Sequence, residues 1–263
     1  MIERNTPGDV VRRLQGDPAM AGLSRSLTYY YGDAAREAAI DGMYRRFVRP
    51  GDLVFDIGSH VGDRIASFRR LGARVVAVEP QPLCMRALEA LYGADREVAL
   101  VEAACGDSEG TVALHVNSRN PTVSTSSPEF PRAADGSRGW EDQVWDEEIT
   151  VRSVTLDALI DRFGTPAFIK IDVEGYEDVV LAGLNRPVPA LSFEFTTIVR
   201  DVAERSLHRA GELGFTGFDL SLGESMSWSF GRWIDSAEMT KHLFALPHEA
   251  NAGDIYAVRR HDQ

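Results

Sequence analysis

Short apolar runs that alternate with segments of helical periodicity are the feature that most constrains the fold of this 263-residue chain. The runs expected to form strands lie at 53–57, 75–78, 98–101, 168–171 and 190–195. Most of them are continuous, which is typical of strands covered on both faces. Between them, apolar residues recur at helical spacing, as in 156–163, where Thr155 is a suitable N-cap. The pattern predicts an α/β fold with a doubly wound parallel sheet and right-handed crossovers.

Two regions depart from this alternation. Residues 1–50 are expected to form an N-terminal helical extension, whose clearest helix, 34–48, ends before the pair Pro50-Gly51. Residues 51–263 then form the main domain. Within it, the segment at about 117–148 is rich in Ser, Pro and Arg and lacks apolar periodicity. Because long irregular loops in compact domains usually bind or cover something, we expect a loop insertion that acts as a lid or binding segment.

Charge and composition argue against several classes of function. The formal net charge of −12 at pH 7 disfavours a nucleic-acid partner, because phosphate backbones are repelled. Two cysteines, Cys84 and Cys105, are too few for a disulfide framework or a structural zinc site. The N-terminal stretch has no long apolar segment, which predicts neither a signal peptide nor a membrane span. We therefore expect a cytoplasmic protein, and a homo-oligomer is compatible with the sequence.

The stretch FDIGSHVGD, residues 55–63, predicts a ligand-binding turn after the first strand. Ligands of open α/β sheets bind at the carboxyl ends of the strands, so Gly58 and Gly62 are expected to border the crevice. Glycine is needed where a ligand approaches the backbone closely. Glu79 follows the second strand, at about the position where such folds hold a ribose diol with a carboxylate.

Asp56, just before the turn, indicates the charge of the ligand. A dinucleotide turn normally has the spacing G-x-G-x-x-G, whereas this one is G-x-x-x-G with Ser59 and His60 inside it. A carboxylate 4 Å from a phosphate costs about 4 kcal/mol at intermediate dielectric, whereas a cation is attracted. We therefore expect S-adenosylmethionine, which carries a sulfonium and an ammonium group, with Asp56 facing its positive end directly or through water. Capping of the following helix by Asp56 is the structural alternative.

Four stretches, in this order, resemble the FkbM family of S-adenosylmethionine-dependent methyltransferases: VFDIGSHVGD, VVAVEPQP, TLDALI and FIKIDVEGYEDVVLAGL. The similarity runs from about Gly51 to Phe195, and IKIDVEGYE is its most specific part. The resemblance implies a class I methyltransferase, with a Rossmann-like, seven-stranded, mostly parallel sheet. It further implies that the last two strands form an antiparallel hairpin, for which 215–220 and 254–258 are the candidates.

The resemblance also implies which residues contact the cofactor, with Glu79 on the ribose. The residues expected to bind it all lie at strand ends: Asp56, Gly58, Ser59, Gly62, Glu79, Pro80 and Asp172. One departure matters, because the family often has Ala-Asn inside the turn where this chain has Ser59-His60. His60 is then expected near the reactive methyl group, with a role that the resemblance does not supply.

Acceptor chemistry is expected at the ends of the strands 168–171 and 190–195. Methyl transfer requires the acceptor, the methyl carbon and the sulfur to be aligned. A hydroxyl acceptor must also lose a proton, to a general base or under the influence of a metal. The catalytic candidates are ionisable residues from these two strands and from the turn after the first strand: Lys170, Asp172, Glu174, Glu194 and, in the turn, His60.

Each catalytic candidate also has a structural interpretation. His60 could hydrogen-bond a carbonyl within the turn, and Lys170 could form an ion pair with a neighbouring acid. Asp172 and Glu174 are expected to contact the cofactor ammonium, the acceptor or helix N–H groups in preference to a metal. An all-oxygen cluster would suit Mg²⁺ better than zinc, but we assign no metal ligand from the sequence.

Segments outside the strands are candidates for the walls of the acceptor pocket. Residues 29–31 are three tyrosines, and Trp228 and Trp233 lie in a glycine- and serine-rich stretch. These aromatic side chains could cover a small acceptor or pack in the core. The segment 120–125, at the start of the insertion, could form a substrate edge.

The sequence thus predicts a methyltransferase that modifies a hydroxyl of a small molecule, such as a sugar, a lipid head group or a secondary metabolite. This acceptor class is an expectation drawn from the resemblance. N-methylation, an NAD(P)-dependent oxidoreductase and a non-catalytic cofactor-binding module are the alternatives. The absent G-x-G-x-x-G spacing and Asp56 oppose the oxidoreductase, whereas the intact turn and the intact end of the strand 168–171 oppose the non-catalytic module.

Overall fold

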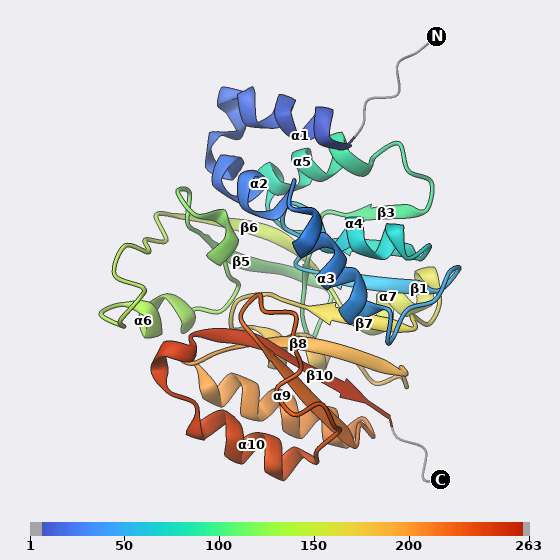
Figure 1. Cartoon of the computed structure of the whole chain (residues 1–263). Coiled ribbons are helices and arrows are strands. Elements are labelled where there is room, and N and C mark those ends of the chain that lie inside the picture. The colour runs from blue at the N-terminus through green and yellow to red at the C-terminus, as the bar shows by residue number, and fades with distance from the viewer. Residues whose placement is uncertain (1–6, 260–263) are drawn as a thin grey trace.

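The computed structural model describes residues 7–259, and within this range a seven-stranded sheet forms the centre of the molecule (Figure 1). In spatial order its strands are β3 (Val98–Val101), β2 (Arg74–Val78), β1 (Leu53–Ile57), β7 (Phe168–Ile171), β8 (Ala190–Thr196), β10 (Ala252–Val258) and β9 (Gly217–Leu222). The first five pair in parallel, whereas β10 is antiparallel to both β8 and β9. The predicted α/β, doubly wound, mostly parallel sheet is confirmed, and β9 and β10 form the expected antiparallel hairpin.

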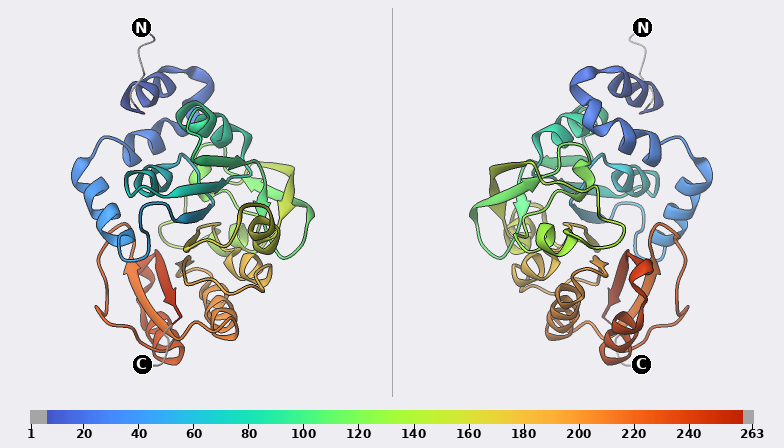
Figure 2. Two further views of the ribbon diagram at one scale, coloured as in Figure 1. Left: turned by 90° about the vertical axis from the view of Figure 1, so that its right-hand side faces the viewer. Right: turned by 90° about the vertical axis from the view of Figure 1, so that its left-hand side faces the viewer.

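Helices cover both faces of this sheet, as Figure 2 shows from two sides. One face packs against α3 (Ala34–Tyr44), α4 (Asp63–Arg70) and α5 (Pro82–Tyr92). The other packs against α7 (Leu156–Phe163), α8 (Glu177–Ala182), α9 (Arg200–Glu212) and α10 (Ser236–Ala245). In β1, Val54 packs in the hydrophobic cluster on the side of α3, α4 and α5, whereas Phe55 packs in the cluster on the side of α7 to α10. Because successive side chains face two buried layers, the central strands are continuous apolar runs.

The N-terminal extension is mostly helical in its described part. Before α3 it contains α1 (Pro7–Gly16), a 3₁₀ turn η1 (Pro18–Leu23) and α2 (Ser24–Tyr30). These three elements share a hydrophobic cluster with Cys84 and Ala87 of α5, so that α1 and α2 lie at the end of the molecule opposite α10 (Figure 1). Cys84 is buried in this cluster. Among the described residues, no helix is long and apolar enough to cross a membrane.

A small second sheet lies beside the first and was not predicted. Its strands, in spatial order, are β4 (Ala104–Cys105), β6 (Glu147–Val154) and β5 (Gly110–Val116). The segment between β5 and β6, which makes up most of the expected insertion, contains a 3₁₀ turn η2 (Pro121–Val123) and α6 (Phe130–Ala134). Phe130 and Trp140 of this segment pack with Val199 and Val202 at the start of α9. The insertion therefore has a small hydrophobic core of its own. A last 3₁₀ turn, η3 (His248–Ala250), precedes β10.

Candidate active site

A pocket opens at the carboxyl ends of β1, β2, β7 and β8. It collects most of the residues that the sequence predicted for the site: Gly58, Ser59, His60, Glu79, Pro80, Lys170, Asp172, Glu174 and Glu194. Asp56 and Gly62 do not line it.

The glycines of the turn between β1 and α4 are required by the protein's own packing. Gly58 has φ 82°, and a Cβ there would lie 1.7 Å from the carbonyl oxygen of Asp172 at the end of β7. Gly62 has φ 84°, and its Cβ would lie 2.5 Å from the ring of Tyr92. The sequence attributed both glycines to close approach of a ligand. The structure gives a second reason, because each one packs against a neighbouring segment of the chain, and the ligand contact stays a prediction.

Asp56 lies beneath the pocket, on the face of the sheet covered by α3 and α4. It pairs in register with Lys170, which in turn pairs with Ser192, so the three side chains form a polar row across β1, β7 and β8. Asp56 is 1% exposed, and neither of its carboxylate oxygens has a hydrogen-bond partner within residues 7–259. Burial raises the pKa of Asp56 to about 6. The expected direct contact with a cofactor does not fit this burial, and the side chain does not cap α4.

Glu79 holds the turn against the end of β2. Its carboxylate accepts hydrogen bonds from the backbone N–H of His60 at 2.8 Å and of Gln81 at 2.9 Å. Burial raises the pKa of Glu79 to about 7. Each carboxylate oxygen has a second lone pair, so Glu79 can still accept a hydrogen bond from a ligand in the pocket that it lines.

His60 lies between the N-terminal extension and the insertion. Its Nε2 is 3.5 Å from the Thr122 hydroxyl, and its ring meets the ring of Tyr30 edge-on, with 5.8 Å between centroids. The side chain therefore contacts the pocket wall, in contrast to the alternative of a hydrogen bond within the turn. Burial lowers the pKa of His60 to about 4, so the imidazole is neutral at pH 7.

Lys170 and Asp172 form the ion pair that the sequence offered as an alternative for the lysine. The ammonium of Lys170, which is 2% exposed, lies 2.5 Å from Asp172 Oδ2, whereas the side chain of Asp172 is 33% exposed. Burial lowers the pKa of Lys170, but the negative charges of Asp172, Asp254 and Asp56 together outweigh this and raise it. Lys170 is therefore a fixed positive charge at pH 7 and not a general base.

Asp172, Glu174 and Glu194 converge at the ends of β7 and β8. One oxygen from each carboxylate lies within 4.8 Å of the others. Burial, followed by the charge of Asp172, raises the pKa of both Glu174 and Glu194 well above the ordinary range. Glu174 has φ 56°, and its carbonyl accepts a hydrogen bond from the Thr125 hydroxyl at 2.7 Å. The insertion therefore helps to fix this part of the site.

The loop that carries Glu174 is held from α8. The carboxylate of Glu177 accepts hydrogen bonds from the backbone N–H of Val173 at 3.1 Å and of Gly175 at 3.2 Å. A Cβ on Gly175 would lie 2.4 Å from the ring of Phe130. Tight packing and these hydrogen bonds set the direction in which the chain leaves β7.

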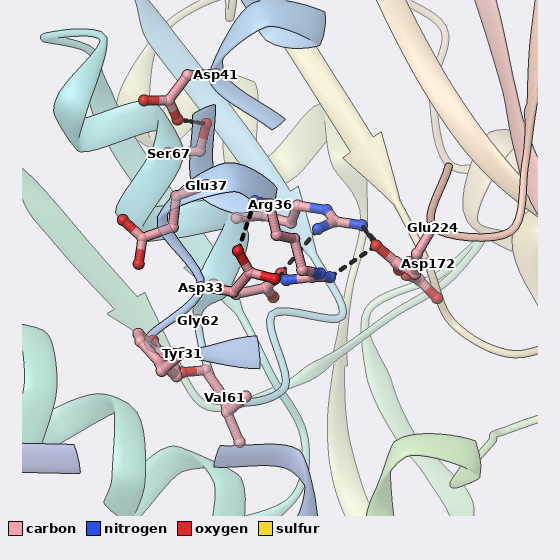
Figure 3. Close-up of polar contacts among 12 residues, drawn as sticks. Tyr31, Asp33, Arg36, Glu37, Asp41, Val61, Gly62, Ser67, Asp172 and Glu224 are labelled. Carbon is pink, nitrogen blue, oxygen red and sulfur yellow. Dashed lines mark hydrogen bonds and ion pairs between the residues drawn. The ribbon is translucent and has the colours of Figure 1, made fainter. Parts of the chain in front are cut away.

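An ionic network at the pocket rim escaped the sequence analysis. Glu224, between β9 and α10, accepts hydrogen bonds from Arg64 at 2.9 and 3.0 Å and from Arg36 at 2.7 Å. Figure 3 shows Arg36 pointing from α3 toward Glu224. Arg64 also contacts Asp63 at 2.7 Å, and Asp63, Arg64 and Glu224 all line the pocket. Partners so far apart in the chain leave no local pattern that could reveal them.

The candidate wall segments differ in where they lie. Thr122, Ser124 and Thr125 of the insertion line the pocket, and the Gln81 amide ties this edge to β2 by donating to the Pro121 carbonyl at 2.9 Å. Tyr30 lines the pocket, whereas the hydroxyl of Tyr31 donates to the carbonyl of Val61. Trp228 and Trp233 pack around Phe47 and Tyr256, outside the pocket.

The sheet order, its single reversed strand and the pocket at the strand ends define the fold of a class I, S-adenosylmethionine-dependent methyltransferase. The family model described as the methyltransferase FkbM domain matches residues 56–205. This match spans more than half of the sequence, and the chain belongs to the FkbM methyltransferase family. Of the functions that the sequence left open, methyl transfer is therefore the one that the family match supports. No curated protein gives a significant sequence match.

Several solved structures are similar to this one at low identity. A TehB-like SAM-dependent methyltransferase from Corynebacterium glutamicum has a TM-score of 0.48 and 11% identity, with 97% of this chain and 100% of that one covered. A putative O-methyltransferase from Klebsiella pneumoniae has a TM-score of 0.44 and 12% identity, with 98% of this chain and 93% of that one covered. Aeropyrum pernix fibrillarin with bound S-adenosyl-L-methionine has a TM-score of 0.46 and 12% identity, with 85% of this chain and 74% of that one covered. All three TM-scores lie below 0.5, so no conclusion on function rests on them.

Proposed function

We propose that this methyltransferase O-methylates a hydroxyl group of a small molecule. The observation that carries the proposal is the convergence of three carboxylates, those of Asp172, Glu174 and Glu194, in the pocket that also contains Glu79. A hydroxyl acceptor must lose its proton during methyl transfer, and such carboxylates can accept it. The acceptor class, a sugar, lipid head group or secondary metabolite, is part of the proposal.

The residues of the turn and the neighbouring strand ends fit the cofactor. S-adenosylmethionine, when bound, supplies a methyl group activated by its sulfonium. Glu79 would accept hydrogen bonds from the ribose hydroxyls, and the turn at Gly58 and Ser59, with Pro80, would form the wall beside them. The exposed part of Asp172 would face the ammonium group. Asp56 would act from beneath the turn, through water, as a negative charge that favours a cation.

The acidic residues beside the acceptor would divide the remaining work. Glu174 and Glu194 have raised pKa values, which makes them stronger bases than an ordinary carboxylate once they are ionised. The neutral His60 would accept or donate a hydrogen bond at the acceptor, beside Thr122. Lys170 would keep Asp172 ionised and in place through their ion pair.

The proposal also extends to the partner of the protein and to its cellular compartment. The partner is a small molecule and not a nucleic acid, because the net charge of −12 disfavours phosphate backbones. The protein is cytoplasmic, because both cysteines are buried free thiols, as is usual in reducing compartments.

Mass spectrometry tests the proposal. A metabolite extract incubated with the enzyme and deuteromethyl-labelled S-adenosylmethionine is expected to yield a product with the labelled methyl group on oxygen. Asp172→Asn is expected to lower turnover at least about tenfold while changing cofactor affinity less, because the lost charge belongs to the carboxylate cluster at the acceptor as well as to the contact with the cofactor ammonium. Thermal unfolding of the variant checks that the fold survives the loss of the partner of Lys170. A label on nitrogen, no labelled product, or unchanged turnover of Asp172→Asn would contradict the proposal.

A further inference from the structure

The carboxylates of Asp172, Glu174 and Glu194 converge on one point instead of lining a wall. One oxygen from each lies within 4.8 Å of the other two. A hard divalent cation binds oxygen ligands at about 2.0–2.6 Å, so oxygens on opposite sides of it lie about 4–5 Å apart. The span of the three oxygens therefore matches the coordination shell of a single ion.

Two members of this cluster lack the partners that buried acids normally have. Glu174 is 8% exposed and lines the pocket, and its carboxylate forms no hydrogen bond or ion pair with any residue from 7 to 259. The Oε2 atom of Glu194 is buried and also lacks a hydrogen-bond partner in the described part of the chain. Buried charged groups are normally paired or bound to a metal, so these carboxylates point to a missing cation.

The charges around the cluster indicate the valence of that cation. With an ion bound, the three carboxylates would be ionised and carry three negative charges, and Lys170, at 2.5 Å from Asp172 Oδ2, supplies one positive charge. Two negative charges are left, which one divalent cation would neutralise.

We propose that Asp172, Glu174 and Glu194 bind a hard divalent cation of the Mg²⁺ class. The donor set consists of oxygen alone, which such ions prefer and zinc does not. Taken alone, the sequence favoured other roles for Asp172 and Glu174, because it could not place Glu194 beside them or reveal that their partners are absent. The part-exposed Asp172 leaves a side of the site open to the pocket.

The cation gives the proposed function a further component. A metal-bound hydroxyl is more acidic than a free one, so the ion would hold the acceptor oxygen and ease the transfer of its proton to a carboxylate oxygen of the cluster that does not bind the ion. This role rests on the proposed O-methylation, whereas binding of the ion does not. The two can therefore be tested separately.

Titration of the metal-free protein with Mn²⁺, followed by the electron paramagnetic resonance signal of the free ion, tests the site without cofactor or acceptor. We expect one Mn²⁺ per chain, displaced by Mg²⁺. Glu174→Gln and Glu194→Gln are each expected to weaken binding at least about tenfold, because each removes a charged ligand. Glu109→Gln, an exposed acid outside the pocket, is the matched control and is expected to bind as the unmodified protein does.

Thermal unfolding in chelator checks that the variants are folded. If a variant is not folded, the number of Mn²⁺ ions bound by the unmodified protein and their displacement by Mg²⁺ decide whether the metal site exists. Absence of Mn²⁺ binding, or binding unchanged in both folded variants, would overturn the proposed metal site. A protein that binds Mn²⁺ at this site but yields no labelled methyl product would contradict only the proposed function. Methyl transfer that chelator does not reduce, in a protein that binds no Mn²⁺, would contradict only the metal site.

Discussion

Gly58 is the residue at which the site is least tolerant of a side chain. Its φ of 82° is one that L-residues with a Cβ rarely adopt. A Cβ would also lie 1.7 Å from the Asp172 carbonyl oxygen, which is backbone and cannot rotate away. The end of β7 is therefore in direct contact with the turn after β1, and the two can move only together.

Gly58→Ala is expected to lower the free energy of unfolding by on the order of 3 kcal/mol, because backbone strain and a backbone clash act together. Gly42→Ala is the matched control. Gly42 lies in α3, is exposed, and has no atom within 4 Å of the position of a Cβ. That substitution is expected to be neutral or to stabilise by up to about 1 kcal/mol. Denaturant unfolding measures both, and a Gly58→Ala protein as stable as the control would contradict the described turn.

The residue-scale predictions from sequence succeed where one strand end carries the information. An ion pair with a neighbouring acid was one of the two interpretations of Lys170, and its partner Asp172 is only two positions away in the sequence. Asp56 lies beneath the pocket instead of lining it, which the sequence could not show, because a motif gives spacing but not the face of the strand. Val54 and Asp56 share one face of β1, whereas Phe55 and Ile57 share the other, and both faces are buried.

At the element scale, the central strands and the helix cap could be read from the sequence. Thr155 caps α7, with its hydroxyl accepting a hydrogen bond from the Ala158 N–H at 3.0 Å, as predicted. Long apolar runs give reliable strands because both of their faces are buried. The sheet order of the C-terminal hairpin followed only from the family resemblance.

The small sheet could not be read in the same way. β5 and β6 keep many residues exposed or half-buried, so their apolar content is low and their pattern is weak. Between them, Phe130 and Trp140 are buried by contacts with the start of α9, which is distant in the sequence. Elements of this kind are fixed by tertiary packing, and the pocket edge formed by the insertion was therefore expected only in outline.

At the scale of the whole molecule, burial of acids beneath and around the pocket makes stability depend on pH. Burial raises the pKa of Glu79 to about 7 and that of Glu177 to about 8. An acid whose pKa is raised by folding stabilises the protein below its unfolded pKa, and this contribution is lost as pH rises through the folded pKa. His60 acts in the opposite direction only below pH 6.5, because its pKa falls to about 4.

The free energy of unfolding is therefore expected to decrease between pH 6.5 and 8, by on the order of 2 kcal/mol, in the protein without cofactor and in chelator. Glu177→Gln is expected to make this decrease smaller, because the Gln carbonyl can still accept the N–H groups of Val173 and Gly175 without titrating. Denaturant unfolding across this pH range provides the measurement. Stability that is constant or rises with pH would contradict the described burial of these acids.

Calorimetric titration of S-adenosylmethionine tests most directly whether the strand ends form the cofactor site. The account predicts one molecule bound per chain, no measurable binding of NADH, and affinity at least about tenfold lower in Glu79→Ala, since a charged hydrogen-bond acceptor is lost. Glu89→Ala, an exposed substitution on α5, is expected to bind like the unmodified protein. NADH binding that S-adenosylmethionine displaces, or equal affinity of Glu79→Ala and the unmodified protein, would contradict it.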